Sequence, residues 1–250
     1  MAEPAERRAE RDGGKRLAGN RAERDAAERG GAGRAPGRRI AVLEPGGDAG
    51  ARGRAAGPGQ AAGLGQAAAL LLADLEDAYA AYERMSSYRG DDAEPTAFLE
   101  AGGAPCNTAI AACAVGAMPQ AAAIAAALGA SRSAASAPSH GASPVAADGA
   151  ARAYLVVVCP SADGCEGLHA LERLSGELLP YGIVLSGAVI VTHGGQIPAL
   201  MGTPRLGMWR RPVAEAIDRL IGAMRMGSAL DAPIIASPSR LWLRLRGLAR

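Results

Sequence analysis

The sequence predicts an α/β domain built on a parallel sheet of five strands, and three observations lead to this prediction. Short, continuous apolar runs predict strands that are buried on both faces, as the strands of parallel sheets are. Between these runs lie longer stretches in which apolar residues recur every three or four positions, as on one side of an α-helix. Glycine-rich loops follow several of the apolar runs. An alternation of strands and helices indicates parallel pairing through right-handed crossovers.

Length and composition narrow the class of protein. A chain of 250 residues suits one α/β domain with additional tails. Apolar residues make up 49% of the chain, which allows a sizeable core. The formal net charge is only +2, whereas nucleic-acid-binding proteins usually carry a strong basic excess. Lys15 is the only lysine, and the remaining basic residues are arginines, as a GC-rich genome would give. We therefore expect no nucleic-acid partner.

The first 38 residues predict a disordered tail. Residues 1–38 are mostly Ala, Arg, Glu and Gly with almost no large apolar side chain, a composition that cannot build a core. They also lack the apolar stretch of a secretory signal, so a cytoplasmic location is expected. The four cysteines form no Cys-x2-Cys pair and there are only three histidines, which argues against a zinc site and against a disulfide framework.

The first half of the domain begins with a short buried strand. Residues 39–43 form an apolar run that leads into the glycine loop Glu44-Pro-Gly-Gly47. An amphipathic helix follows from Leu64 to Met85, because its apolar residues fall on one face at helical spacing. A weak strand is expected at residues 96–99.

Residues 101–131 carry no charge, and two readings of them are open. Their length suffices for a membrane span, which needs about 20 apolar residues. Alanine contributes little to insertion, however, and Asn107, Pro119 and Gln120 interrupt the stretch. We favour a short buried strand at 108–112 followed by an Ala-rich helix at about 119–128, with proline in its first turn. A membrane partner is therefore not expected.

The second half opens with a flexible insertion and the strongest strand of the chain. Residues 131–150 are rich in Ser, Ala, Pro and Gly, as flexible segments are. The run Tyr154–Cys159 is continuously apolar and predicts a strand buried on both faces. Asp163 and Glu166 have the spacing of a capping box, in which Asp163 would cap the following helix. Pro180 closes that helix.

One more strand and one more helix complete the domain, which we place at residues 39–240. The strand spans 183–191 and ends in the loop Thr192-His-Gly-Gly195. The helix carries apolar residues at regular spacing from Trp209 to Met224, and Gly227 is expected to end it. Met208 and Trp209 could close over a cofactor or form a homodimer contact, with core packing as the alternative.

Residues 241–250 form a basic C-terminal segment in which arginines alternate with Leu and Trp. Such a segment could lie on an anionic membrane surface. Docking of the segment on the domain is the simpler account, and we favour it.

The order and spacing of these elements resemble the flavodoxin-like NAD(P)H-dependent flavin oxidoreductases, in the FMN reductase branch. The run Tyr154–Cys159 and the helix with His169-Ala-Leu-Glu172 are similar to the fourth strand and following helix of that family. Gly187–Gly195 and Pro212–Gly227 resemble the fifth strand, its glycine loop and the final helix. Pro233–Pro238 resembles the C-terminal extension of the family.

The resemblance implies a flavodoxin-like three-layer sandwich that binds FMN beyond the C-terminal ends of its strands, where open α/β sheets bind ligands. It implies an enzyme that uses NAD(P)H to reduce a flavin, quinone or similar small-molecule acceptor. No side-chain acid or base is required, because the cofactor carries the chemistry. The residues that would contact the cofactor are Gly46, Gly47, Arg52, Ala112, Cys113, Cys159, Pro160, Ser161, His193, Gly194 and Gly195.

A second reading is a non-catalytic relative that kept the sheet and lost its flavin contacts, as a scaffold or binding protein. The segment between Leu43 and Leu64 has no Ser or Thr hydroxyl for a phosphate, and residues 112–115 offer no aromatic side chain to a flavin ring. The glycine loops at the strand ends favour the enzyme.

Overall fold

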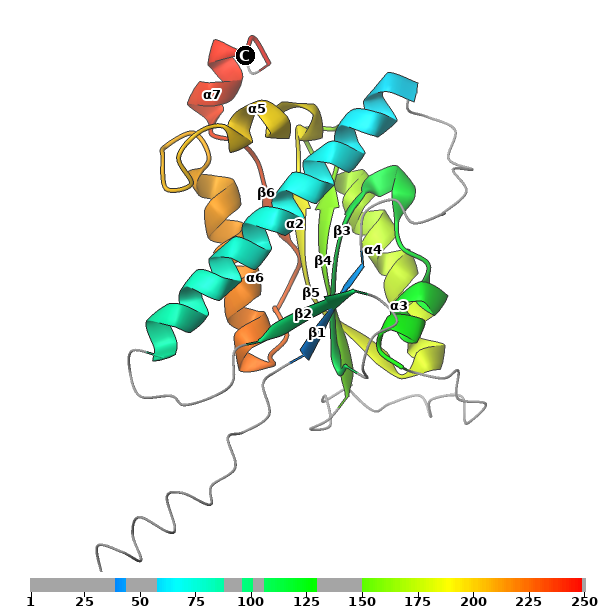
Figure 1. Cartoon of the computed structure of the whole chain (residues 1–250). Helices are drawn as coiled ribbons and strands as arrows, with labels where there is room; N and C mark the ends of the chain where they lie inside the picture. The colour runs from blue at the N-terminus through cyan, green and yellow to red at the C-terminus, as the bar shows by residue number, and fades with distance from the viewer. Residues whose placement is uncertain (1–38, 44–57, 88–95, 101–105, 130–149, 249–250) are drawn as a thin grey trace, which may run out of the picture.

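A computed structural model describes residues 39–43, 58–87, 96–100, 106–129 and 150–248. These residues form one all-parallel sheet of six strands in the order β2-β1-β3-β4-β5-β6 (Figure 1). The strands are β1 (Arg39–Leu43), β2 (Ala97–Glu100), β3 (Thr108–Ala114), β4 (Ala151–Val158), β5 (Ile183–Val191) and β6 (Ile234–Ala236). The predicted parallel α/β class is confirmed, and the order of the first five strands is consistent with a flavodoxin-like fold.

The predicted number of strands was wrong, because a sixth strand lies beside β5. Ile234 and Ile235 pair in parallel with Val189 and Ile190. The segment is only three residues long, and Pro233 precedes it directly. Proline is tolerated at the start of an edge strand, because it removes no hydrogen bond of the ladder there. A strand this short can therefore form between flanking prolines, although those prolines favour an irregular extension in the sequence.

Helices cover both faces of the sheet. The helices of one face are α2 (Pro58–Ser87), α5 (Ile197–Met201) and α6 (Arg211–Met226), and those of the other are α3 (Ala121–Ala127) and α4 (Cys165–Leu178). Single turns of 3-10 helix form at η1 (Val115–Ala117), η2 (Leu179–Tyr181) and η3 (Gly194–Gln196), and α7 (Arg240–Leu245) is the last helix.

The buried part of strand β4 shows why the sequence is continuously apolar from Ala153 to Val158. Tyr154, Val156 and Val158 face the core beneath α2 and α6, whereas Leu155 and Val157 face the core beneath α3 and α4. Successive side chains of a strand point to opposite faces, so a strand covered on both sides needs an apolar residue at every position. The one polar side-chain group between Tyr154 and Val158, the Tyr154 hydroxyl, donates a hydrogen bond to the Ser228 carbonyl at 2.8 Å.

Three helix ends were predicted, with different outcomes. Helix α4 ends at Leu178, and Pro180 lies in the 3-10 turn that follows it, as expected. Gly227 ends α6 in the left-handed conformation at φ 60°, as expected. The capping box at α4 was wrong, because the helix is capped by Gly164 at φ 72°. The Asp163 carboxylate instead accepts the Cys165 N–H at 3.2 Å. Because Gly164 holds the N-cap position, Glu166 is the second residue of the helix and not the third, where the reciprocal bond of a capping box forms.

The uncharged stretch forms a strand and a short helix, in line with the favoured reading. The predicted place of Pro119 in the first turn was wrong, because Gln120 holds the N-cap position and the helix begins at Ala121. Strand β3 is buried throughout and α3 is seven residues long. Among the described residues, no helix has the length and apolar character needed to cross a bilayer. The predicted tail at 1–38, all but the last residue of the predicted insertion at 131–150, and the loop that holds Gly46, Gly47 and Arg52 lie outside the described residues.

The C-terminal segment docks on the domain, as favoured. Leu243 of α7 is buried, and the Trp242 ring lies 5.8 Å from the Trp209 ring, centroid to centroid. The Ser239 hydroxyl accepts the Trp242 N–H at 3.2 Å and so caps α7. Trp209 packs partly buried against the core, while Met208 is exposed.

Candidate functional site

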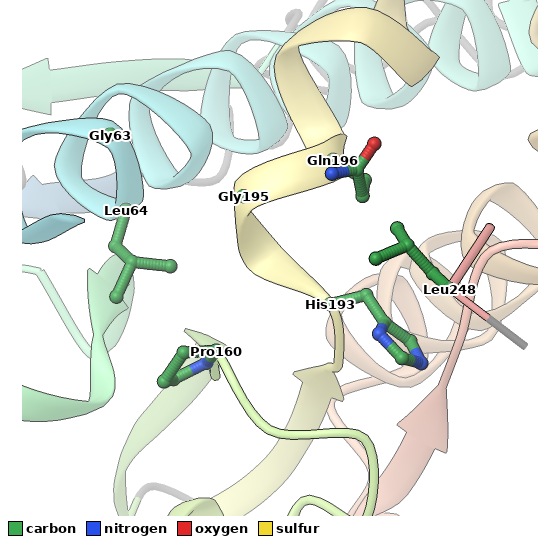
Figure 2. Close-up of a pocket in the computed structure, with 7 residues that line it drawn as sticks. All are labelled: Gly63, Leu64, Pro160, His193, Gly195, Gln196 and Leu248. Carbon is green, nitrogen blue, oxygen red and sulfur yellow. The ribbon is translucent and has the colours of Figure 1, made fainter. Parts of the chain in front are cut away.

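A cavity of about 360 Å³ lies at the rim where β4 and β5 end. Because all strands are parallel, their C-terminal ends meet at one edge of the sheet, which is where ligands bind in folds of this class. Figure 2 shows the side chains that surround the cavity. The lining residues are Gly63, Leu64, Pro160, His193, Gly195, Gln196 and Leu248.

Backbone hydrogen bonds tie the loops after β4 and β5 together. The His193 N–H donates to the Ser161 carbonyl at 3.2 Å, and the Gly194 N–H donates to the Cys159 carbonyl at 2.8 Å. The Gln196 N–H closes the turn onto the His193 carbonyl at 2.8 Å. The two loops therefore form one continuous wall, in which backbone hydrogen bonds hold the main chain of His193 and Gln196.

His193 adopts a backbone conformation that side chains rarely adopt. Its φ of 53° and ψ of 41° lie in the left-handed region, and it is the one non-glycine residue with positive φ in the part of the chain that the structure describes. A left-handed residue with a side chain costs on the order of 1–2 kcal/mol relative to the right-handed conformation. Such residues cluster at ligand sites, and the His193 side chain lines the cavity (Figure 2).

Gly194 allows α2 to pack directly on this loop. A Cβ atom at Gly194 would lie 2.5 Å from Leu64 Cδ2 and 2.5 Å from Val158 Cγ1. Real Cβ atoms do not approach other atoms so closely, so only glycine fits here without a shift of helix or strand. This close approach brings Leu64 to the mouth of the cavity, opposite the loop.

The lining combines apolar walls with two polar side chains. Leu64, Pro160 and Leu248 supply the apolar surface, and the His193 imidazole and the Gln196 amide supply hydrogen-bond donors and acceptors. A few placed polar groups among apolar ones are typical of small-molecule sites. None of the described lining residues carries a carboxylate, a guanidinium or an ammonium group.

The C-terminal segment supplies one wall of the cavity. After α7, Gly247 turns the chain at φ 69°, and the Leu248 N–H donates to the Leu243 carbonyl at 2.8 Å. This is the hydrogen bond of a Schellman motif, which reverses the chain at the end of a helix. The turn places Leu248 beside His193 (Figure 2).

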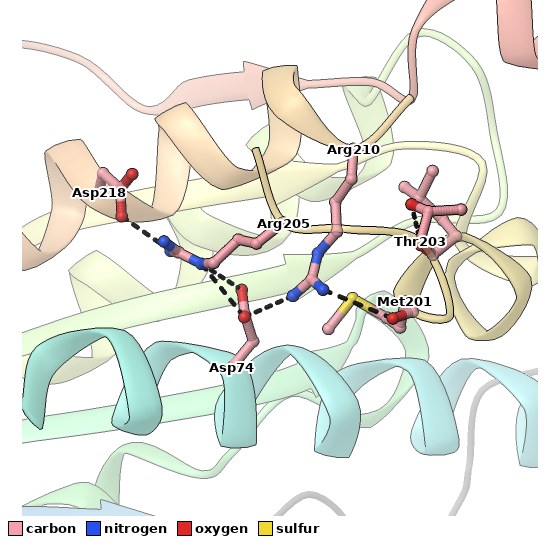
Figure 3. Close-up of polar contacts among 7 residues, drawn as sticks. Asp74, Met201, Thr203, Arg205, Arg210 and Asp218 are labelled. Atoms are coloured by element: carbon pink, nitrogen blue, oxygen red, sulfur yellow. Dashed lines mark hydrogen bonds and ion pairs between the residues drawn. The ribbon is translucent and has the colours of Figure 1, made fainter. Parts of the chain in front are cut away.

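A buried ionic network fixes the connection between α5 and α6. Asp74 of α2 pairs with Arg210, and it accepts a hydrogen bond from Arg205 Nε at 3.2 Å (Figure 3). Arg205 also reaches Asp218 of α6 at 2.7 Å. Because the Arg210 and Asp74 side chains are buried, removing either one would leave the other charge buried without a partner and would destabilise the fold. It anchors the segment that carries Trp209, on which α7 rests.

The cysteines at the strand ends do not face the cavity. A Cβ on Gly167 of α4 would lie 2.9 Å from Cys159 Sγ, so the thiol points into the core beneath α4. Burial raises the pKa of Cys159 to about 11, and burial raises the pKa of Cys113 to about 12. Both thiols therefore stay protonated at neutral pH, and neither is a nucleophile there.

The structure brings together four of the predicted positions around the cavity. Pro160, His193 and Gly195 line it, and Gly194 lies buried beneath them. Ser161 contributes its carbonyl to the wall. Ala112, Cys113 and the Cys159 side chain are packed in the core.

Four lining residues were not predicted, namely Gly63, Leu64, Gln196 and Leu248. Gln196 is in the same loop as His193 and could have been found as the nearest polar side chain. Leu64 was recognised as the first apolar residue of its helix, but periodicity does not show which end of a helix reaches a site. No sequence signal points to Leu248.

Comparisons of the chain with protein-family models, with curated proteins and with solved structures find no match. The family named from the sequence therefore stays a prediction. Within the described part of the chain, no three His, Cys, Asp or Glu side chains lie together in a way that could hold a metal ion.

Proposed function

We propose that the chain is a flavin-dependent oxidoreductase that binds FMN at the C-terminal rim of its sheet. The observation that carries the proposal is the cavity at the ends of β4 and β5, where a strained His193 stands beside Gln196. In this class of fold, that edge is where nucleotide cofactors bind. The resemblance of the sequence to the FMN reductase branch agrees with this placement.

The described lining fits the ring of a flavin in size and in chemistry. Ligand sites for compounds of this kind measure on the order of 300–1,000 Å³, and the cavity of about 360 Å³ falls in that range. Leu64, Pro160 and Leu248 provide apolar surface for a flat ring system. The His193 imidazole and the Gln196 amide would bond its polar edge, which carries both donors and acceptors.

The N-terminus of α2 lies at the same rim, as Figure 1 shows. Free N–H groups and the dipole of a long helix favour a phosphate at such a position. When bound, FMN supplies the redox chemistry, with NAD(P)H as hydride donor and a flavin, quinone or similar molecule as acceptor. The protein residues bind and orient the ring, and the apolar walls exclude water.

A non-catalytic binding protein is the second candidate, and one observation favours it. The loop that follows β3, which begins with Val115, offers no aromatic side chain and does not line the cavity. One face of a bound flavin ring would therefore contact small or aliphatic groups and no aromatic side chain. Such a site could hold a small heterocycle without redox chemistry.

Absorbance separates the two candidates. The purified chain is incubated with FMN and desalted, and a retained band near 450 nm (roughly, as for any oxidised flavin) together with NAD(P)H oxidation supports the oxidoreductase. His193→Ala should lower the retained FMN by about tenfold, because it removes a hydrogen bond at a buried edge. His169→Ala, an exposed histidine on α4, is the matched control and should retain FMN normally.

Retained FMN without NAD(P)H oxidation would favour the binding protein. Colourless protein after desalting, at any FMN concentration tried, would contradict the oxidoreductase.

A further inference from the structure

The outward side of α7 carries two leucines that are more than half exposed. Leu243 is buried against the domain. Each residue of a helix is rotated by about 100° from the one before, so residues two positions away point to the opposite side. Leu241 and Leu245 stand two positions before and after Leu243, and they are 52% and 68% exposed. They form an apolar ridge that points away from the domain.

Arginines flank this ridge. Arg240, Arg244 and Arg246 are exposed, and none of them forms an ion pair with another described residue. The guanidinium of Arg246 lies over the Trp242 ring, 5.0 Å from its centroid. Between Ala232 and Leu248 the sequence has no Asp or Glu. We call the surface of Leu241, Leu245 and the three arginines the α7 outer face.

We propose that the α7 outer face binds the surface of a bilayer that contains anionic phospholipids. Guanidinium groups form charge-assisted hydrogen bonds with headgroup phosphates, and a cluster of basic residues is drawn to an anionic leaflet. The two leucines would enter the boundary between headgroups and acyl chains, as the apolar face of an interfacial helix does. The docked side of α7 keeps its contacts with the domain.

The size and shape of the face favour lipid over a protein partner. A stable protein–protein interface buries about 800 Å² on each partner. A ridge of two leucines on a helix of six residues supplies only a small part of such an area. Reversible binding to an anionic bilayer requires less, because a few inserted side chains and a few basic residues are sufficient. This inference does not depend on the proposed enzyme activity.

Co-sedimentation with vesicles tests the proposal. The full chain is mixed with vesicles of phosphatidylcholine alone or with about 30% phosphatidylglycerol, which models an anionic leaflet. We expect binding to the anionic vesicles only, and release at about 0.5 M NaCl, where charges are screened. The double variant Leu241→Ser with Leu245→Ser should bind about tenfold more weakly, and Arg244→Gln about fivefold.

Two matched variants serve as controls. Leu179→Ser changes a leucine that is 64% exposed elsewhere on the surface, and Arg219→Gln changes an exposed arginine of α6. Both should bind the anionic vesicles like the unchanged chain. All variants should keep the thermal midpoint of the parent, since the changed side chains are exposed.

Equal binding to neutral and anionic vesicles would overturn the proposal, as would anionic binding that the Leu241 and Leu245 changes leave intact. Absence of binding to either kind of vesicle would also overturn the proposal. If the chain then self-associates in light scattering and the double variant is monomeric, the α7 outer face binds a second copy of the chain.

Discussion

The carboxylate of Asp74 in α2 forms an ion pair with the guanidinium of Arg210, and both side chains are more than nine-tenths buried. The pair joins residues 136 positions apart, one in the longest helix and one directly before α6. Arg210 Nη1 also donates to the Met201 carbonyl at 3.5 Å. The pair therefore holds the connection between α5 and α6 against α2.

Asp74→Ala should destabilise the chain by about 3–5 kcal/mol, because it leaves the buried charge of Arg210 without its partner. Urea unfolding measures this loss. Asp77→Ala, at an exposed position of the same helix, should change the free energy of unfolding by at most about 0.5 kcal/mol. The double variant Asp74→Leu with Arg210→Met should regain more than half of the loss, since no unpaired charge remains buried. A double variant as unstable as Asp74→Ala would contradict this explanation.

His193→Gly should affect stability and binding in opposite directions. Glycine adopts the left-handed conformation freely, so the free energy of unfolding should rise by about 0.5–1 kcal/mol. Retention of FMN should fall, because the imidazole is lost. His169→Gly, in the middle of α4, should instead lose about 1 kcal/mol, as glycine does inside a helix. Thermal unfolding and FMN absorbance measure the two effects, and a His193→Gly variant that is less stable than its parent would refute the strain argument.

Gly194→Ala should destabilise the chain by about 1–3 kcal/mol, the usual cost of overpacking. The added methyl would press against Leu64 and Val158. Gly195→Ala is the control, because a Cβ there meets nothing within 4 Å. Denaturation curves of the two variants should differ clearly, and similar curves would mean that α2 can shift without cost.

The buried thiols predict a loss of stability at alkaline pH. The pKa of Cys159 is raised from about 9 to about 11 by burial, and burial raises the pKa of Cys113 to about 12. Below pH 9 both states keep these protons. Above pH 9 the thiols lose their protons in the unfolded chain but keep them in the folded chain. The free energy of unfolding should therefore fall between pH 9 and 11. Urea unfolding over this range should show a shallower fall for Cys159→Ala with Cys113→Ala than for the parent. Equal slopes would show that other groups cause the effect.

The sequence predicts the layers of this fold well, because burial on two faces leaves a clear pattern. The run Tyr154–Cys159 is apolar at every position since helices cover both of its sides. The helix end at Gly227 was predictable because left-handed residues are usually glycine. β6 was missed because a strand of three residues is too short for a periodic signal.

The site was only half predictable, for a different physical reason. Pro160, His193 and Gly195 lie where parallel strands end, and topology alone brings such residues together. Leu248 reaches the cavity only because Trp242 packs on Trp209 and Gly247 reverses the chain. Contacts of that kind depend on tertiary packing, which local sequence patterns do not encode. The orientation of the Cys159 thiol depends on the absence of a side chain at Gly167, a residue eight positions away on the next helix.

In the part of the chain that the structure describes, the two outermost strands are the shortest of the sheet, with four residues in β2 and three in β6. An outer strand presents unpaired N–H and C=O groups on which another chain can add a strand, and long flat edges lead to aggregation. Here each edge strand offers only a few such groups, and Pro233 directly precedes β6. The short borders thus protect a strongly apolar sheet from recruiting further polypeptide into fibre-like assemblies.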